Sequence, residues 1–329
     1  MVASAPVGPD VLKLADVELA WPRGPHDVLV ELRAAALNPA DIYFRQSGGY
    51  VAGDGPLVLG HDGMGVVKEI GAAVTTVAVG DRVCFCNGGI GGEPGTYAEA
   101  AVAPEWQLAR VPDDVDDLTA ASLPLVTITA WESLYDRALV SAGEFVLIHG
   151  GAGGTGHVGI QLAALRGARV AATVSSPEKA RIAKEFGAEL AIRYRETDFV
   201  DAALAWSGGV HVALDNAGAD ILQRTFRAMA PYGRIVTLMG TPGDDDAMTA
   251  YNMNLTIHNV MMLTPMWKRL HDRLKEQAEI LRQALRLVSE GRLRIRQAAS
   301  YPLERAAEAH ALLESGRAIG KVTLRIALP

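Results

Sequence analysis

A glycine-rich run, Gly150-Gly-Ala-Gly-Gly-Thr-Gly156, carries the clearest chemical signal in the chain. Three of its glycines have the GxGxxG spacing, which lets a backbone turn approach a pyrophosphate while N–H groups at the start of a helix meet its charge. With 34 glycines in 329 residues, this spacing could arise by chance. The context argues otherwise, because an apolar stretch, 145–148, precedes the turn and a helical pattern, 158–165, follows it. The predicted dinucleotide contacts in this turn are Gly151, Gly153, Gly154, Thr155 and Gly156.

A second set of polar side chains lies closer to the N-terminus, in the segment 38–50. Hydrogen-bond donors among them could stabilise negative charge that develops on a substrate oxygen. A phenol suits this task because it donates a hydrogen bond without titrating near neutral pH. Tyr43 is therefore the first candidate, although it could instead be a packed aromatic whose hydroxyl faces water. The candidate catalytic residues are Tyr43, Asn38, Asp41 and Tyr50.

The glycine turn belongs to a segment in which predicted strands and helices alternate, a pattern typical of a parallel sheet covered on both faces. After the strand that precedes the turn, strands are predicted over 168–174, 189–194, 210–214, 233–239 and 255–263. Six strands make a complete doubly wound dinucleotide fold. Asn216, Met239 and Gly240 follow two of these strands, where such folds bind their ligands, although they could equally be turn residues.

The residues on either side of this segment predict a different domain. Short strands at 28–34, 65–70, 81–85 and 97–102 are broken by Gly, Pro and Asp turns, as expected of an antiparallel, barrel-like domain. Helices are predicted over 268–290 and 303–315, followed by a last strand over 320–326. We expect that strand to rejoin the first domain. The predicted domains are 1–123, 124–265 and 266–329, with the nucleotide-binding domain inserted between two parts of the other.

Composition excludes several classes of function. The chain is 49 % hydrophobic and 21 % charged, as in ordinary globular proteins, and its formal net charge of −7 argues against nucleic-acid binding. No apolar run approaches the roughly 20 residues of a membrane span, and no secretion signal is evident, so we expect a cytoplasmic protein. Cys84 and Cys86 are predicted to be reduced thiols, because a disulfide at this spacing would be strained.

The choice of nicotinamide cofactor depends on the end of the second strand of the parallel sheet. NAD-binding folds place an Asp or Glu there, about 20 residues beyond the glycines. In this chain Val174 is followed by Ser175 and Ser176, and no carboxylate appears before Glu178. The serine hydroxyls, together with Lys179, suit a 2′-phosphate better than a bare diol. The serines could instead cap the next helix, and the two roles are compatible, so the sequence favours NADPH.

Several motifs occur along the chain in the order found in a known family. They are Gly8-Pro-Asp-Val-Leu12, Asn38-Pro-Ala-Asp41, Leu59-Gly-His-Asp-Gly63, Val79-Gly-Asp-Arg-Val83, the glycine turn, Tyr232-Gly-Arg-Ile-Val236 and Gly320-Lys-Val-Thr-Leu324. On these motifs the chain resembles the medium-chain dehydrogenase/reductases, and within them the quinone oxidoreductase or zeta-crystallin-like branch. The resemblance covers nearly the whole chain and implies an α/β fold, with a Rossmann domain inserted in a GroES-like catalytic domain.

The resemblance also implies roles for particular residues. Tyr194 matches a tyrosine that similar quinone reductases place against the 2′-phosphate, and Thr129 matches a residue that often touches the nicotinamide amide. Asn38, Asp41 and the nearby tyrosine match positions that face the nicotinamide or the quinone in these enzymes.

Zinc-containing members of the same family are similar to this chain around His61. They hold catalytic zinc with a cysteine about where Asn38 stands, a histidine at His61, and a Cys or His ahead of the first Rossmann strand. Catalytic zinc needs about three protein ligands. Asn38 is a poor ligand, and residues 121–130 contain neither Cys nor His. We therefore expect no metal, and we expect His61 to be a hydrogen-bonded turn residue.

Hydride transfer from NADPH to a small electrophilic substrate is the function that these features predict. A Met-rich pocket formed by Tyr50, the loop at Ile90 and residues 261–267 would accept quinones, alkenals, enones or enoyl thioesters. No evident basic clamp for a CoA phosphate is present, so a free quinone or enone is favoured. Two alternatives stay open: an alcohol dehydrogenase with an altered metal site, and a non-catalytic NADPH-binding protein. The apolar edge strand at 255–263 predicts a homodimer.

Overall fold

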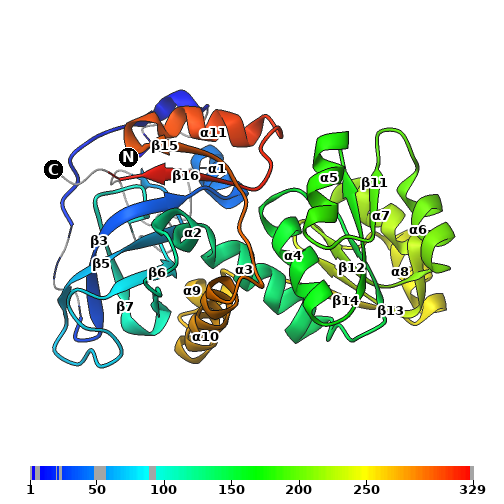
Figure 1. Cartoon of the computed structure of the whole chain (residues 1–329), viewed down its shortest axis with the longest axis horizontal. Coiled ribbons are helices and arrows are strands. Elements are labelled where there is room, and N and C mark those ends of the chain that lie inside the picture. Colours follow the sequence, from blue (N-terminus) through cyan, green and yellow to red (C-terminus); the bar gives the residue numbers. More distant parts are fainter. Residues whose placement is uncertain are drawn as a thin grey trace. The chain divides into compact units, whose positions relative to one another are not determined.

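The computed structural model describes residues 2–3, 8–19, 21, 24–47, 57–88 and 94–326 (Figure 1). The chain forms two compact units. Unit 1 comprises Met1–Ile128 and Leu263–Pro329, and unit 2 comprises Thr129–Met262. Unit 2 is therefore an insertion in the sequence of unit 1.

Unit 2 contains a six-stranded parallel sheet. Its strands are β9 (Phe145–Ile148), β10 (Arg169–Val174), β11 (Leu190–Arg193), β12 (Val210–Asp215), β13 (Met229–Thr237) and β14 (Thr256–Asn259). They lie in the order β11-β10-β9-β12-β13-β14, which is the order of a doubly wound dinucleotide-binding fold, as the sequence predicts. β14 is shorter than the predicted strand over 255–263, because the chain turns there into α9 (Thr264–Trp267).

Helices cover both faces of this sheet (Figure 1). They are η3 (Glu132–Arg137), α4 (Gly154–Leu165), α5 (Pro177–Glu185), α6 (Phe199–Ser207), α7 (Ala219–Thr225), η4 (Phe226–Ala228) and α8 (Asp244–Met253). On one face, Leu147 and Ala213 of the strands join a buried cluster with Phe199 of α6 and Leu222 of α7. The neighbouring strand residue Ile148 points to the opposite face, toward α4. Burial on both faces explains why these strands are almost continuously apolar.

Unit 1 contains a mixed, mostly antiparallel sheet. Its strands are β3 (Asp27–Ala36), β5 (Asp62–Ile70), β6 (Arg82–Cys86), β7 (Ala100–Pro104), β8 (Ala109–Arg110), β15 (Gln297–Pro302) and β16 (Lys321–Arg325). The order is β15-β16-β3-β5-β6-β8, with β7 paired to β3. The last strand, β16, pairs antiparallel with β3 and so returns to the first part of the chain, as predicted. The short strands β1 (Val2–Ala3), β2 (Leu12–Lys13) and β4 (Leu57–Val58) form a separate small sheet.

One strand of unit 1 begins later than predicted. The sequence predicts a strand over 97–102, whereas β7 begins at Ala100. The difference arises because Thr96 and Tyr97 donate their backbone N–H groups to the carbonyls of Gly60 and Leu59 instead. This connection carries the Tyr97 side chain into the interior of unit 1, where it is fully buried.

The helices of unit 1 are η1 (Pro9–Val11), α1 (Pro39–Ser47), η2 (Glu105–Gln107), α2 (Asp117–Ser122), α3 (Pro124–Trp131), α9, α10 (His271–Ser289), η5 (Leu303–Arg305) and α11 (Ala306–Glu314), with α3 crossing into unit 2. α10 is the long amphipathic helix that the sequence predicts. It packs against η2 and β8, and it buries Leu274, Leu281 and Leu285. Within the described residues, no helix is both long and apolar enough to cross a membrane.

Candidate functional site

The glycine turn of unit 2 lies between β9 and α4, and its shape requires glycine. A Cβ added to Gly151 would lie 2.5 Å from the Cβ of Ala172 in β10. A Cβ added to Gly156 would lie 2.2 Å from the carbonyl oxygen of Gly150, which itself has a φ of +67°. Side chains at these positions would therefore prevent the close approach of β9, β10 and α4.

The first turn of α4 presents backbone donors to a possible ligand. The helix begins after Gly153, which provides no side-chain cap, and its first turn contains Gly154, Thr155 and Gly156. The N–H groups at the start of a helix have no acceptor within the helix, and the helix dipole adds partial positive charge there. This arrangement suits the pyrophosphate of a dinucleotide.

A buried acceptor next to the turn also fits a dinucleotide. Asn216 follows β12, and its Nδ2 donates to the carbonyl oxygen of His149 at 2.8 Å. Its Oδ1 is buried and has no hydrogen-bond partner among the described residues. Buried acceptors are rarely left unpaired, so a donor from a ligand, such as a ribose hydroxyl, is expected there. Met239 is exposed, and the carbonyl oxygen of Gly240 accepts a hydrogen bond from Thr237.

The end of β10 carries hydroxyls and a cation, with no carboxylate before α5. Ser176 caps α5, because its Oγ accepts a hydrogen bond from the backbone N–H of Lys179 at 3.2 Å, so the capping role that the sequence left open is present. Burial lowers the pKa of the Lys179 ammonium, and the nearby charge of Arg195 lowers it further. Tyr194, at the end of β11, is half-exposed. Arg195 is not among the cofactor contacts predicted from the sequence, because its proximity to Lys179 depends on the pairing of β10 with β11.

Unit 1 contains a buried polar cluster assembled from distant parts of the sequence. We use the name buried polar cluster for six residues, none more than 2 % exposed: Asn38, Asp41, His61, Asp62, Tyr97 and Lys321. α1 supplies Asp41 in its first turn, β5 begins at Asp62, and β16 begins at Lys321. Because β3 pairs with both β5 and β16, the starts of these two strands come close together.

Lys321 and Asp62 form a buried ion pair in this cluster. The Lys321 Nζ donates to Asn38 Oδ1 at 2.6 Å, to the Leu37 carbonyl oxygen at 2.9 Å and to Asp62 Oδ2 at 3.2 Å. Asp62 also accepts from Asn38 Nδ2 at 2.8 Å and from the backbone N–H of Leu125 at 2.8 Å. Burial raises the pKa of Asp62, and these donors oppose that effect. Both polar atoms of the Asn38 amide are consequently occupied.

Asp41 and His61 form a second buried pair. The Nδ1 atom of His61 lies 2.5 Å from Asp41 Oδ1. Asp41 Oδ2 accepts from the backbone N–H of Asn38 at 2.7 Å and from the Tyr97 hydroxyl at 3.2 Å. Although burial alone would raise the pKa of Asp41, its interactions with His61, His310 and Asn38 lower it overall. The other ring nitrogen of His61, Nε2, is buried and has no hydrogen-bond partner among the described residues.

Arg45 and His310 lie next to this pair, where α1 contacts α11. The buried Arg45 guanidinium lies 3.0 Å from His310 Nδ1 and 2.5 Å from Glu314. Burial lowers the pKa of His310 to about 4, and Arg45 lowers it too, whereas Asp41 raises it. His310 is therefore neutral at physiological pH. Its ring packs edge-on against Tyr97, at a centroid distance of 5.7 Å.

The structure brings some of the predicted catalytic residues together and leaves others apart. Asn38 and Asp41 both belong to the buried polar cluster. Tyr43 lies on α1 but is 56 % exposed and makes an edge-on contact with Phe44. Tyr50 and the loop at Ile90 lie outside the described residues. His61 is hydrogen-bonded, and it lies in the bend that precedes β5.

Three further residues that the sequence analysis names are buried. Thr129 is buried in α3. Cys84 and Cys86 are both free thiols on β6. Burial raises the pKa of each thiol, and the nearby Asp62 carboxylate raises it further. These cysteines are therefore poor nucleophiles.

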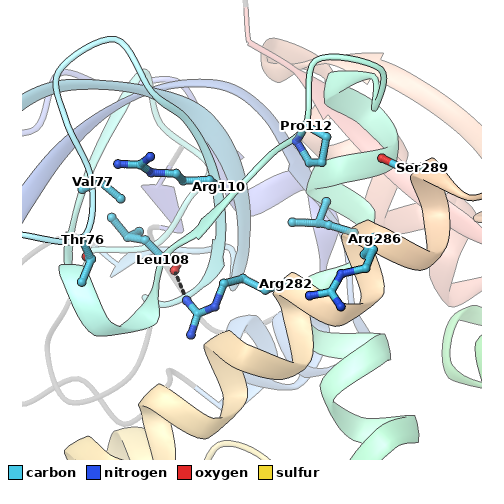
Figure 2. A pocket seen from close by; sticks show the side chains of 9 residues that line it. Thr76, Val77, Leu108, Arg110, Pro112, Arg282, Arg286 and Ser289 are labelled. Atoms are coloured by element: carbon cyan, nitrogen blue, oxygen red, sulfur yellow. Dashed lines mark hydrogen bonds between the residues drawn. The ribbon is translucent and has the colours of Figure 1, made fainter.

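Unit 1 also has a surface hollow of about 340 Å³ between β8 and α10 (Figure 2). Leu108, Pro112 and Leu285 give it an apolar floor, and three exposed arginines, Arg110, Arg282 and Arg286, line its rim. The Arg282 guanidinium donates to the Leu108 carbonyl oxygen. None of the predicted site residues lines this hollow.

Known proteins resemble the chain over almost its whole length. An alcohol dehydrogenase GroES-like domain matches residues 24–113, and a family described as zinc-binding dehydrogenase matches residues 186–324. A 2-haloacrylate reductase from Burkholderia sp and a quinone oxidoreductase from Pseudomonas aeruginosa are each 32 % identical, and each match covers 96 % of both chains.

Solved structures agree with these relatives. An NAD-dependent alcohol dehydrogenase superposes with a TM-score of 0.88 at 32 % identity, covering 99 % of both chains. A mycobacterial protein complexed with NADPH superposes with a TM-score of 0.86 at 29 % identity, covering 98 % of both chains. The chain belongs to the quinone oxidoreductase branch of the medium-chain dehydrogenase/reductase superfamily. It is an oxidoreductase of the kind that acts on quinones or unsaturated compounds.

Proposed function

We propose that this protein is an NADPH-dependent reductase that transfers hydride to a quinone or an α,β-unsaturated carbonyl compound without a metal. The observation that carries the proposal is that the Asn38 side chain has no free polar atom. Its amide oxygen accepts a hydrogen bond from Lys321, and its amide nitrogen donates one to Asp62. Two of its relatives are named for chemistry on such acceptors, a quinone in one case and a haloacrylate in the other.

The residues of this chain do not fit a catalytic zinc. Zinc requires about three protein ligands. Asn38 has no polar atom to offer, and among the described residues no group of three or more His, Cys, Asp or Glu is placed to hold a metal ion. His61 Nε2 would be a single ligand. An acceptor whose double bond or ring is already electron-poor does not need a metal to activate it, which is why a quinone or an enone is the preferred substrate class.

The residues of unit 2 do fit a dinucleotide. The glycine turn and the first turn of α4 would hold the pyrophosphate, and Asn216 Oδ1 would accept from a ribose hydroxyl. When bound, the nicotinamide supplies a hydride. The side chains of unit 1 would then stabilise the charge that reaches the oxygen of the acceptor.

The preference for NADPH is proposed from the side chains at the ends of β10 and β11. Ser175, Ser176 and Tyr194 would donate hydrogen bonds to the 2′-phosphate, and Lys179 and Arg195 would neutralise its charge. Two cations placed close together repel one another, and an anionic ligand between them relieves that repulsion.

Replacing Lys179 tests this preference. Since a hydrogen bond to a charged group contributes about 1.5–3 kcal/mol, Lys179→Ala should weaken NADPH binding by about 10- to 100-fold and leave NADH binding nearly unchanged. Both dissociation constants can be measured from the fluorescence of the reduced nicotinamide. Lys184→Ala, in the last turn of the same helix, is the matched control and should alter neither. Equal losses for NADPH and NADH in Lys179→Ala would refute the assignment.

A substrate screen separates this function from its alternatives. The loss of NADPH absorbance should be followed with a panel of quinones and enones, with and without a strong chelator. Turnover that the chelator abolishes would favour an alcohol dehydrogenase with an altered metal site. Tight NADPH binding without turnover on any acceptor would favour the non-catalytic alternative.

A further inference from the structure

We propose that His61 is the general acid of the reaction: its Nε2 gives a proton to the carbonyl oxygen of an enone as the hydride arrives at the β-carbon. The inference rests on the proposed function and specifies how the charge on the acceptor is neutralised. It is carried by the Asp41–His61 pair and by the Nε2 atom of His61, which is buried and has no hydrogen-bond partner in the described part of the chain.

The arrangement around Asp41 fixes the orientation of the His61 ring. Both carboxylate oxygens of Asp41 are within reach of donors, since Oδ1 faces His61 Nδ1 and Oδ2 accepts from Asn38 N and the Tyr97 hydroxyl. A carboxylate with this many donors stays ionised, in agreement with its lowered pKa. An ionised carboxylate at 2.5 Å requires a proton on Nδ1. The Phe44 ring packs against the imidazole at a centroid distance of 5.0 Å and limits its rotation.

With Nδ1 committed to Asp41, all exchange of protons by this ring takes place at Nε2. In the imidazolium state Nε2 is a donor, and after it has given up its proton it is an acceptor. A positioned general acid of this kind typically accelerates a reaction about 10²- to 10⁴-fold. An unpaired buried nitrogen is also unfavourable, so a substrate oxygen that bonds to Nε2 satisfies it.

The step balances in atoms and charge. A C–H bond forms at the β-carbon from the hydride that NADPH supplies, and the electrons of the C=C bond shift toward the carbonyl oxygen. That oxygen takes the proton of Nε2, which yields a neutral enol and leaves a neutral imidazole. The enol becomes the saturated ketone in solution, and the imidazole regains a proton from water.

The test compares two acceptors that share a carbon skeleton. Reduction of 2-cyclohexenone produces a strongly basic enolate, whereas reduction of 1-nitrocyclohexene produces a nitronate that is stable as an anion. The wild-type protein should reduce both with NADPH. His61→Gln should lower kcat for the enone by about 100-fold or more, the size expected of a lost general acid, and kcat for the nitroalkene by only a few fold. The dissociation constant for NADPH should not change.

His26→Gln is the matched control. His26 is also in unit 1, and its Nδ1 also lies against a carboxylate, that of Glu105 at 2.7 Å, but its side chain is 46 % exposed. This substitution should leave kcat for both acceptors unchanged. A readout that does not depend on turnover is nitrogen-15 NMR of histidine-labelled protein, in which wild type should show a proton on His61 Nδ1 protected from exchange with solvent.

Three results would overturn the inference. An unchanged kcat for the enone in His61→Gln is the first, and equal losses for the enone and the nitroalkene, which would indicate a purely structural role, are the second. The third is a wild-type protein that reduces quinones but no enone, a result that leaves the proposed function intact. If His61→Gln does not fold, single-turnover reduction by the wild type decides the question. The enone should then react more slowly in D₂O than in H₂O while the nitroalkene does not, because only the enone takes a proton in the rate-limiting step, and equal rates would count against His61.

Discussion

Lys321→Met is the substitution whose effect on stability follows most directly from the structure. Methionine preserves most of the length of the side chain but removes the ammonium. Leu37 O, Asn38 Oδ1 and Asp62 Oδ2 each lose a donor, and Asp62 keeps two, from Asn38 and from the backbone of Leu125. Asp62 then carries a buried charge without a counter-charge.

The size of the effect can be approximated in two ways. At 3.2 Å and an effective dielectric constant of about 20, the attraction between the two charges is about 5 kcal/mol. Removal of one partner of a buried ion pair typically costs about 3–5 kcal/mol. Because the two side chains are 2 % and 0 % exposed, solvent screens this pair little. We therefore expect the free energy of unfolding to fall by about 3–5 kcal/mol at neutral pH.

Urea unfolding followed by circular dichroism measures this loss. Lys68→Met is the control, because Lys68 pairs with Glu31 at the surface and should contribute no more than about 1 kcal/mol. Adding Asp62→Asn to Lys321→Met removes the uncompensated charge and should restore a large part of the stability. A loss below about 1 kcal/mol in Lys321→Met, or a double variant whose effects simply add, would refute the reasoning.

The loss should also depend on pH. Burial raises the pKa of Asp62, and removal of Lys321 raises that pKa further. A carboxyl whose pKa is higher in the folded state than in the unfolded state favours folding when protonated. The deficit of Lys321→Met should therefore be largest at neutral pH and should shrink as the pH falls through the pKa of Asp62 in the folded variant. A deficit independent of pH would mean that Asp62 is not the source of the loss.

Two further predictions concern the reaction and the assembly. Tyr43→Phe should lower kcat with quinones and enones while the dissociation constant for NADPH stays the same, if the exposed hydroxyl on α1 donates to the acceptor; an unaltered kcat would remove Tyr43 from the mechanism. Among the described strands, β14 pairs only with β13, so light scattering should show a homodimer of about twice 34.9 kDa, and a monomer would contradict this expectation.

The parallel sheet of unit 2 was predictable because its signals are local. Each strand is a short apolar run that ends in a turn, and the helix after the second strand begins with a serine cap and a proline at 176–177. The glycine turn falls between β9 and α4, where the GxGxxG spacing places it. The ends of strands were less predictable. The sequence predicts a strand over 255–263, but β14 ends at Asn259, because a strand stops where the neighbouring strand no longer offers hydrogen-bond partners.

The buried polar cluster was only half predictable. Asn38 and Asp41 stood out because they lie three residues apart in one motif. Lys321 did not, since its contact with Asp62 joins residues 259 positions apart and depends on the pairing of β3 with two other strands. The sequence pattern predicts a strand at Tyr97, whereas the backbone hydrogen bonds from Thr96 to Gly60 and from Tyr97 to Leu59 hold this segment away from the strand and leave the Tyr97 side chain buried. Sequence patterns report periodicity along one segment, whereas this cluster depends on strand pairing between segments.

The position of β16 has a consequence for how the protein is made. This strand follows unit 2 in the sequence, yet it lies between β15 and β3 inside the sheet of unit 1. During translation, all of unit 2 is synthesised before β16. Until β16 follows, the first part of unit 1 lacks a strand of its sheet, and Asp62 lacks the Lys321 ammonium that neutralises it. Translation that halts between residues 262 and 321 would thus leave a nascent chain in which unit 2 is complete and the sheet of unit 1 lacks β16, with the apolar faces of that sheet open to aggregation.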